Sequence, residues 1–84
     1  MRYTIEILRS AQKQLAKIDR QDQATVFSAI RNLADTPHPI GCKKLSGRPA
    51  WRLRIGNYRI IYEIHDDRFL ILVISVGHRS EVYR

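Results

Sequence analysis

The first part of the chain changes from a strand-like to a helix-like pattern of apolar residues. Within residues 2–8 every second side chain is apolar, which predicts an opening strand with Tyr3, Ile5 and Ile7 on one face. Ser10 is then a candidate cap for a short helix. The expected buried stripe of this helix is Ala11, Leu15 and Ile18, three to four residues apart. Residues 19–22 interrupt this pattern.

A second helix follows, with Asp22 as its candidate cap. Its expected buried side carries Val26, Ile30 and Leu33, with Phe27 and Ala34 beside them. Pro37 and Pro39 are expected to end it, because the residue before a proline is pushed into extended geometry. Residues 38–50 are rich in proline, glycine and basic residues, so they predict a basic loop.

The second half of the chain predicts a series of antiparallel strands. Residues 51–55 alternate between apolar and basic side chains, and Gly56-Asn57 is a two-residue hairpin signal because both residues tolerate positive φ. Residues 58–65 form the next expected strand and residues 66–68 a turn. Residues 69–76 are almost continuously apolar, as in a central strand, and Gly77 is expected to end it.

This order of elements, βααβββ, predicts an α+β fold with two layers. We expect a small antiparallel sheet of about four strands with the two N-terminal helices packed on one face. The chain has 84 residues, fewer than the roughly 100–150 of a typical domain. Residues 1–84 are therefore expected to form a single domain.

The charge of the chain predicts an acidic partner. Fifteen Lys and Arg residues against eight Asp and Glu residues give a net charge of +7, which favours nucleic acid, an acidic protein or an anionic membrane surface. No acidic residue occurs between Asp35 and Glu63, whereas six basic residues do: Lys43, Lys44, Arg48, Arg52, Arg54 and Arg59. A solvated surface explains such a run as well as a binding site does. A membrane site needs a basic amphipathic helix, which the prolines and glycines of this region disfavour.

Several classes of protein are disfavoured by signals that the sequence lacks. The longest apolar run, residues 69–74, is far shorter than the about 20 residues of a membrane-spanning helix. The N-terminus has no apolar stretch of secretory length, so we expect a cytoplasmic protein. The single Cys42 excludes a disulfide framework. No Gly-rich phosphate loop or metal-spaced ligand cluster occurs in the sequence, so neither metal nor cofactor is expected.

The hairpin predicts a concentration of arginines on one face of the sheet. With a two-residue turn at Gly56-Asn57, Arg54 lies opposite Arg59 and Arg52 lies opposite Ile61. These four residues form what we call the arginine face. The other face of the hairpin is apolar and expected in the core; it carries Trp51, Leu53, Ile55, Tyr58, Ile60 and Tyr62.

Like charges placed directly opposite one another destabilise a strand pair by up to about 1 kcal/mol. Arginine cannot relieve this repulsion by losing its proton. Two explanations remain open. The side chains splay into water or are neutralised by Glu63 and Glu81, or the missing counter-charge is a ligand. Because arginine binds phosphate in a bidentate manner and the strands hold the groups rigidly, we favour a polyanionic ligand.

The C-terminal residues add candidate acid–base and stacking groups. His78, Arg79 and Tyr83 follow the last predicted strand. A histidine can act as general acid or base near neutral pH, and a tyrosine can stack on a base. Taken alone, each of these residues is more often structural, and the nearby arginines strengthen the functional interpretation. RNA can be cleaved with such groups alone, because its own 2′-OH is the nucleophile and the protein need only orient it, stabilise charge and protonate the leaving oxygen.

The second half of the chain resembles a known family. The segments that carry the resemblance are KKLSGRPAWRLRIGNYRIIYEI and ISVGHRSEVYR. They are similar to the RelE family within the RelE/ParE toxin superfamily. The resemblance implies a toxin of a type II toxin–antitoxin system, specifically a ribosome-dependent endoribonuclease that cuts mRNA in the ribosomal A site and inhibits translation. It also implies a small antiparallel sheet with two N-terminal helices.

The resemblance also implies site residues. The alternating basic residues of the family's active-site strand fall on Arg52 and Arg54, and the arginine of its "YR" motif falls on Arg59. The tail arginine falls on Arg79 and the tyrosine of "SEVY" on Tyr83, with His78 as a reserve acid or base. The best-studied branch has lysines where this chain has Arg52 and Arg54, so proton removal from the 2′-OH is expected from another group. Further contacts to RNA or the ribosome are expected from Lys43, Lys44 and Arg48.

Two other functions remain as alternatives. A ParE-like toxin would inhibit DNA gyrase without catalysis, with the arginine face on an acidic protein surface. A non-toxic nucleic-acid binder would show steeply salt-dependent affinity. The resemblance implies a cognate acidic antitoxin as partner, with operator DNA bound only through the toxin–antitoxin complex, in addition to the ribosome and mRNA.

Overall fold

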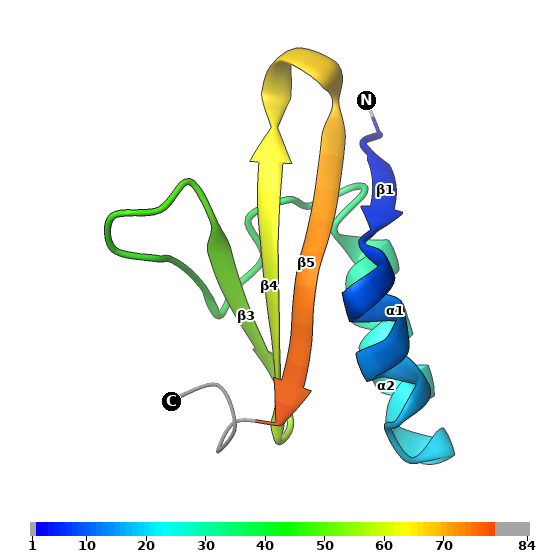
Figure 1. Cartoon of the computed structure of the whole chain (residues 1–84). Helices are drawn as coiled ribbons and strands as arrows, with labels where there is room; N and C mark the ends of the chain where they lie inside the picture. The colour runs from blue at the N-terminus through cyan, green and yellow to red at the C-terminus, as the bar shows by residue number, and fades with distance from the viewer. Residues whose placement is uncertain (1, 79–84) are drawn as a thin grey trace.

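The computed structural model describes residues 2–78, which form two helices and five strands (Figure 1). Strand β1 (Thr4–Ile7) is followed by helices α1 (Arg9–Ala16) and α2 (Arg20–Asn32). The remaining elements are β2 (Cys42–Lys44), β3 (Trp51–Ile55), β4 (Tyr58–His65), the single 3₁₀ turn η1 (Asp66–Arg68) and β5 (Leu70–His78). Neither described helix is long and apolar enough to cross a membrane.

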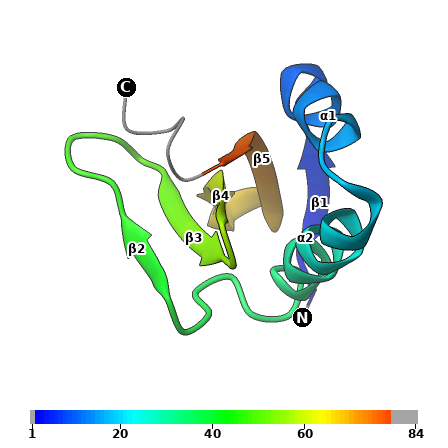
Figure 2. The ribbon, with the colours of Figure 1, turned by 90° about the horizontal axis from the view of Figure 1, so that it is seen from below.

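The strands form one sheet in the order β1-β5-β4-β3-β2, with both helices on one side (Figure 2). The two-layer α+β prediction is confirmed, but two details were wrong. The predicted basic loop contains the short strand β2, which pairs with β3 and is too brief to show an alternating pattern. Strand β1 pairs with β5 in parallel, so the sheet is not purely antiparallel. Apolar alternation gives no information about strand direction.

Both helices begin earlier than their predicted caps. Helix α1 starts at Arg9 with Leu8 at the N-cap, so Ser10 lies inside the first turn. Helix α2 starts at Arg20 with Asp19 at the N-cap, and Asp22 lies in its first turn. Neither N-cap makes a side-chain hydrogen bond. An aspartate is favourable anywhere in the first helical turn because of the helix dipole, so its presence does not fix the starting residue. Helix α2 also ends at Asn32, well before Pro37.

The predicted buried stripes meet the apolar face of the sheet. Ala11 and Leu15 of α1 and Val26, Ile30 and Leu33 of the α2 region pack with the sheet residues Leu53, Ile60, Tyr62, Ile71, Val73 and Val76. Ile18 is only half-buried, and the Phe27 side chain is 37% exposed. Burial of this apolar area is the main stabilising contribution to a domain of this size.

Tyr62 places a hydroxyl inside this core. Its side chain is fully buried, and its hydroxyl donates a hydrogen bond of 2.8 Å to the Pro37 carbonyl oxygen. Burial raises the pKa of the Tyr62 phenol far above its usual value, with a smaller contribution from neighbouring Cys42. The phenol therefore stays protonated and acts as a donor that fastens the 33–41 connection to β4.

The hairpin register is the one that the sequence predicts. Arg54 pairs with Arg59, Arg52 with Ile61 and Ile55 with Tyr58, and Gly56 takes a φ of +57° in the turn. Strand β5 differs from prediction at both ends. It begins at Leu70, because Phe69 has a left-handed φ of 48°, and it continues through Gly77 to His78.

A β-bulge interrupts the pairing of β4 with β5. Tyr62 pairs with Val73, but Ile61 pairs with Ser75, so Ile74 is the extra residue. Without the bulge, Arg59 would lie opposite Val76. With it, Arg59 lies opposite Gly77, and Val76 lies opposite Ile60 in the core. The bulge thus decides which side chains of β5 share the arginine face.

Helix α1 replaces β1 as the neighbour of β5 beyond the bulge. Strand β1 pairs only with residues 70–73, and farther along the Val76 amide donates a 2.8 Å hydrogen bond to Oε1 of Gln14. Val76 is 1% exposed, so this amide has little access to water. The Gln14 side chain therefore satisfies a buried donor that the sheet leaves without a strand partner.

We expect Gln14→Ala to destabilise the protein by about 1–3 kcal/mol, because it leaves this buried amide without its acceptor. The measurement is the free energy of unfolding in urea. Gln12→Ala is the matched control, since Gln12 on the same helix makes an exposed hydrogen bond to the Ile7 carbonyl oxygen. A substitution at an exposed position usually changes the free energy of unfolding by no more than about 0.5 kcal/mol. Equal losses in the two variants would contradict this role of Gln14.

Candidate functional site: a basic face and the cavity beside it

The arginine face is assembled from neighbouring strands, as the sequence predicts. Arg52 and Arg54 project from β3 and Arg59 from β4, on the side of the sheet away from the helices. Strand β2 adds Lys43, which pairs with Arg52. The structure therefore sets two basic pairs side by side, Lys43 with Arg52 and Arg54 with Arg59. The paired strands fix the spacing of these charges before any ligand arrives.

The arginines differ strongly in burial. Arg54 is exposed and Arg52 half-buried, whereas Arg59 is only 4% exposed, and its Nε and Nη2 atoms are covered. Nε of Arg52 is also covered, and no hydrogen-bond acceptor reaches it from residues 2–78. A positive charge held near low-dielectric protein attracts an anion more strongly than one in open water. Of the two explanations left open by the sequence, splaying of the side chains into water does not apply to Arg59.

Glu63 is one of the two carboxylates that the sequence offers as neutralising groups for the arginine face. Its Oε1 lies 2.8 Å from Nε2 of His65, on the same strand. Arg52 makes no ion pair within the described part of the chain. Glu63, the nearer of the two candidate neutralising groups in sequence, is therefore held by His65. The other one, Glu81, lies outside the described residues.

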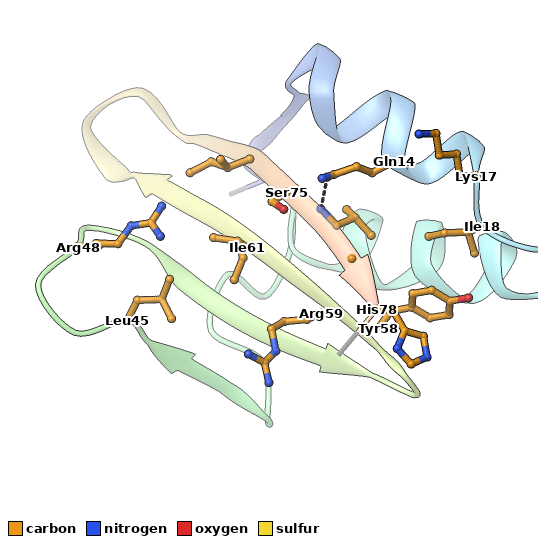
Figure 3. Close-up of a pocket in the computed structure, with 13 residues that line it drawn as sticks. Gln14, Lys17, Ile18, Leu45, Arg48, Tyr58, Arg59, Ile61, Ser75 and His78 are labelled. Carbon is orange, nitrogen blue, oxygen red and sulfur yellow. Dashed lines mark hydrogen bonds between the residues drawn. The ribbon is translucent and has the colours of Figure 1, made fainter. Parts of the chain in front are cut away.

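A cavity of about 790 Å³ adjoins Arg59 (Figure 3). Its lining comes from β4, β5, α1 and the segment after β2: Gln14, Lys17, Ile18, Leu45, Arg48, Tyr58, Arg59, Ile61, Ile74, Ser75, Val76, Gly77 and His78. The small residues Ser75 and Gly77 lie on β5 opposite Ile61 and Arg59. Because these positions carry little or no side chain, the sheet surface is hollow beside Arg59.

The described lining of this cavity is basic. It includes Lys17, Arg48, Arg59 and His78, and none of the lining residues identified is Asp or Glu. Concentrated positive charge around a concave surface favours a phosphate or another polyanionic group. No group of three or more His, Cys, Asp or Glu side chains within residues 2–78 is arranged to hold a metal ion.

The remaining predicted residues are distributed unevenly. Arg48 lines the cavity together with Arg59. Lys44 pairs with Trp51, which places it on the opposite face from Lys43. His78 pairs with Tyr58 and so lies on the helix side of the sheet, although it also lines the cavity. Arg79 and Tyr83 lie outside the described residues.

The Tyr58 ring is held in place at the end of the cavity. Its hydroxyl donates a 3.1 Å hydrogen bond to Oδ2 of Asp22. The ring contacts the His78 ring edge to face, with 5.7 Å between centroids. Sequence reasoning assigned Tyr58 to the core and missed Gln14, Lys17 and Ile18 from α1 entirely. No motif signals these residues, because only the position of α1 beside β5 brings them to the cavity.

Comparison with known proteins agrees with this fold. The family model described as ParE toxin of type II toxin-antitoxin system, parDE, matches residues 5–83. The mRNA interferase toxin RelE of Escherichia coli K12 is 31% identical over 88 residues, covering 99% of this chain and 92% of the relative. Toxin RelG of Mycobacterium tuberculosis is 30% identical over 88 residues, covering 100% of this chain and 99% of the relative.

Comparison with solved structures agrees with the family found from the sequence. A chain in the crystal structure of the toxin–antitoxin complex RelBE2 of Mycobacterium tuberculosis superposes with a TM-score of 0.84 at 26% identity, covering 94% of this chain and 100% of that chain. The fold, the basic face and the sequence matches define a small toxin of the two-component, toxin–antitoxin type. The chain belongs to the RelE/ParE superfamily.

Proposed function

We propose that this toxin is an endoribonuclease that cleaves mRNA on the ribosome and thereby inhibits translation. The observation that carries the proposal is Arg59, a nearly buried arginine beside a basic cavity on a rigid strand pair. The 31% identity to a relative named an mRNA interferase toxin supports the same activity. Preorganised positive charge is what a phosphoryl-transfer transition state requires.

In the proposed reaction the ribose 2′-oxygen attacks the adjacent phosphorus. The P–O2′ bond forms and the P–O5′ bond breaks, which leaves a 2′,3′-cyclic phosphate and a 5′-hydroxyl. Arg52, Arg54 and Arg59 hold the phosphate and stabilise the charge that develops on its oxygens. The guanidinium groups supply this charge without a metal ion, and DNA, which lacks the 2′-OH, is not cleaved.

Proton transfer needs a group other than these arginines, because a guanidinium does not lose its proton. We assign orientation of the nucleotide and proton transfer to Tyr83, with Arg79 on the phosphate or the leaving group and His78 as a further acid or base. Lys43, Lys44 and Arg48 contribute electrostatic contacts to RNA or the ribosome. Since Lys43 and Lys44 lie on opposite faces, they contact different parts of that surface.

We further propose that the physiological partner is an acidic antitoxin. The net charge of +7 favours such a partner, and a similar chain in the solved structures is part of a toxin–antitoxin complex. The antitoxin covers the helical layer or occupies the arginine face. Binding of operator DNA belongs to the complex, in which the antitoxin reads the sequence.

The family match itself supports a second candidate function. The model that covers residues 5–83 is described as a ParE toxin. On this alternative, the toxin inhibits DNA gyrase by binding, and the arginine face contacts an acidic protein surface. The same fold serves both functions, so the target has to be identified by experiment.

The test is to express the toxin in cells and map the 5′ ends of mRNA, with DNA breaks measured in the same cultures. We expect new 5′ ends confined to translated messages, and their loss in the Arg59→Ala variant. Arg68→Ala is the control, since Arg68 is exposed on the turn after β4, outside the cavity. DNA breaks without new mRNA ends would select the gyrase alternative instead.

A further inference from the structure

The cavity beside Arg59 is not confined to the arginine face. Arg48, Arg59 and Ile61 line it on the side of the sheet away from the helices, whereas Gln14, Lys17 and Ile18 line it from α1. Figure 3 shows these two groups on either side of β5. The cavity therefore crosses the sheet where β5 has passed the end of β1.

The hydrogen bond from the Val76 amide to Gln14 fixes the α1 side of this cavity. It ties the last turn of α1 to β5 at 2.8 Å, one residue before Gly77, which lies opposite Arg59. Lys17, the residue at the C-terminal end of α1, is thereby held over the same cavity as Arg59. A lysine near a helix C-terminus also interacts favourably with the helix dipole, but Lys13 in the last turn satisfies that preference without lining the cavity.

We propose that the α1 side of the cavity binds the RNA nucleotide next to the one held on the arginine face, with the Lys17 ammonium on its phosphate. This inference rests on the proposed endoribonuclease function and adds a path for the substrate. RNA crosses the end of the sheet from the arginine face to α1, and does not continue along β3. Lys17 carries no other assigned role.

Three observations favour a nucleic acid over a protein segment in this position. Basic groups face the cavity from both sides of the sheet, and the lining residues identified include no carboxylate. Successive phosphates of one strand can contact basic groups on both sides of the sheet. The Tyr58 and His78 rings, in edge-to-face contact, line the cavity, and the face of an aromatic ring is a surface on which a base can stack.

The test uses the full chain and a fluorescent oligoribonucleotide whose 2′-oxygens are methylated, so that it binds without being cleaved. Affinity is measured by anisotropy from about 50 to 200 mM KCl, where each lost single-strand phosphate contact reduces the slope of log K against log salt by about 0.7. We expect Lys17→Ala to weaken binding several-fold with this loss of slope, and Lys17→Arg to restore both. Lys13→Ala, which removes the same charge from the same helix, should leave the slope unchanged.

The outcomes separate this inference from the proposed function. If Lys17→Ala and Lys13→Ala give the same slope, the subsite on α1 is wrong, and RNA cleavage on the arginine face stands as long as Arg59→Ala still abolishes cutting. If the wild-type chain does not bind the oligoribonucleotide at about 50 mM KCl, the subsite is also wrong. Weakened binding of an acidic polyglutamate peptide by Lys17→Ala, without an effect on RNA, would assign this surface to a protein partner. Circular dichroism melting confirms that each variant folds.

Discussion

Replacement of Arg59 by alanine is expected to slow mRNA cleavage by about 10²- to 10³-fold, which corresponds to roughly 2.7–4 kcal/mol of transition-state stabilisation. Arg59 is the least exposed of the three arginines and lines the cavity next to the arginine face. Its charge acts in surroundings from which water is largely excluded. We therefore expect a larger loss than for Arg54, whose side chain is exposed.

The measurement is the rate of cleavage of a defined message in a reconstituted translation reaction, at saturating toxin. Arg59→Lys keeps the charge but removes the bidentate geometry, so an intermediate rate is expected. A buried arginine also packs with its neighbours, so thermal melting of each variant has to accompany the rates. A folded Arg59→Ala protein that cuts at the wild-type rate would remove Arg59 from the catalytic group.

The second large effect is on stability. Tyr62→Ala is expected to destabilise the protein by about 3–5 kcal/mol, the range found when a buried aromatic residue is replaced by alanine. Tyr62 is fully buried at the centre of the sheet and also holds the Pro37 carbonyl. Because small domains are stable by only about 5–15 kcal/mol, a loss of this size removes a large part of the free energy of unfolding.

Urea unfolding of Tyr62→Ala and Tyr62→Phe separates the two contributions. The phenylalanine variant keeps the ring and loses only the hydrogen bond, so a loss of about 0.5–1.5 kcal/mol is expected. If the two variants were equally destabilised, the hydroxyl contact and not the buried ring would be the main role of Tyr62. Tyr58→Phe, which loses a hydrogen bond to Asp22 nearer the surface, gives a comparison at a less buried position.

The parts of the fold that the sequence predicts are those with local causes. The Gly56-Asn57 turn determines the register of its hairpin, and this register alone places Arg54 opposite Arg59. The apolar stripes of the two helices follow from their spacing, and their members Leu15, Val26 and Ile30 are buried. Each of these features depends on residues that are close in sequence.

The parts that were missed depend on contacts between distant segments. Strand β2 exists because β3 offers an edge to which Cys42–Lys44 can bond, and the direction of β1 is set by its packing beside β5. The candidate site likewise combines residues that the sequence predicts with residues that only the folded chain brings together. Arg52, Arg54 and Arg59 follow from one hairpin, whereas Lys17 and Gln14 reach the cavity only through the docking of α1.

The extra residue in β5 has a consequence for how this chain can vary over evolutionary time. A deletion of Ile74 itself would leave every later pairing with β4 unchanged, because Ile74 has no partner there: Ser75 would still oppose Ile61, and Gly77 would still oppose Arg59. A deletion of Val76 with the bulge kept would instead place Gly77 opposite Ile60 and His78 opposite Arg59. The hollow beside Arg59 would be filled, and a glycine would replace a buried valine in the core. We therefore expect β5 to tolerate the loss of a residue at the bulge and not beyond it.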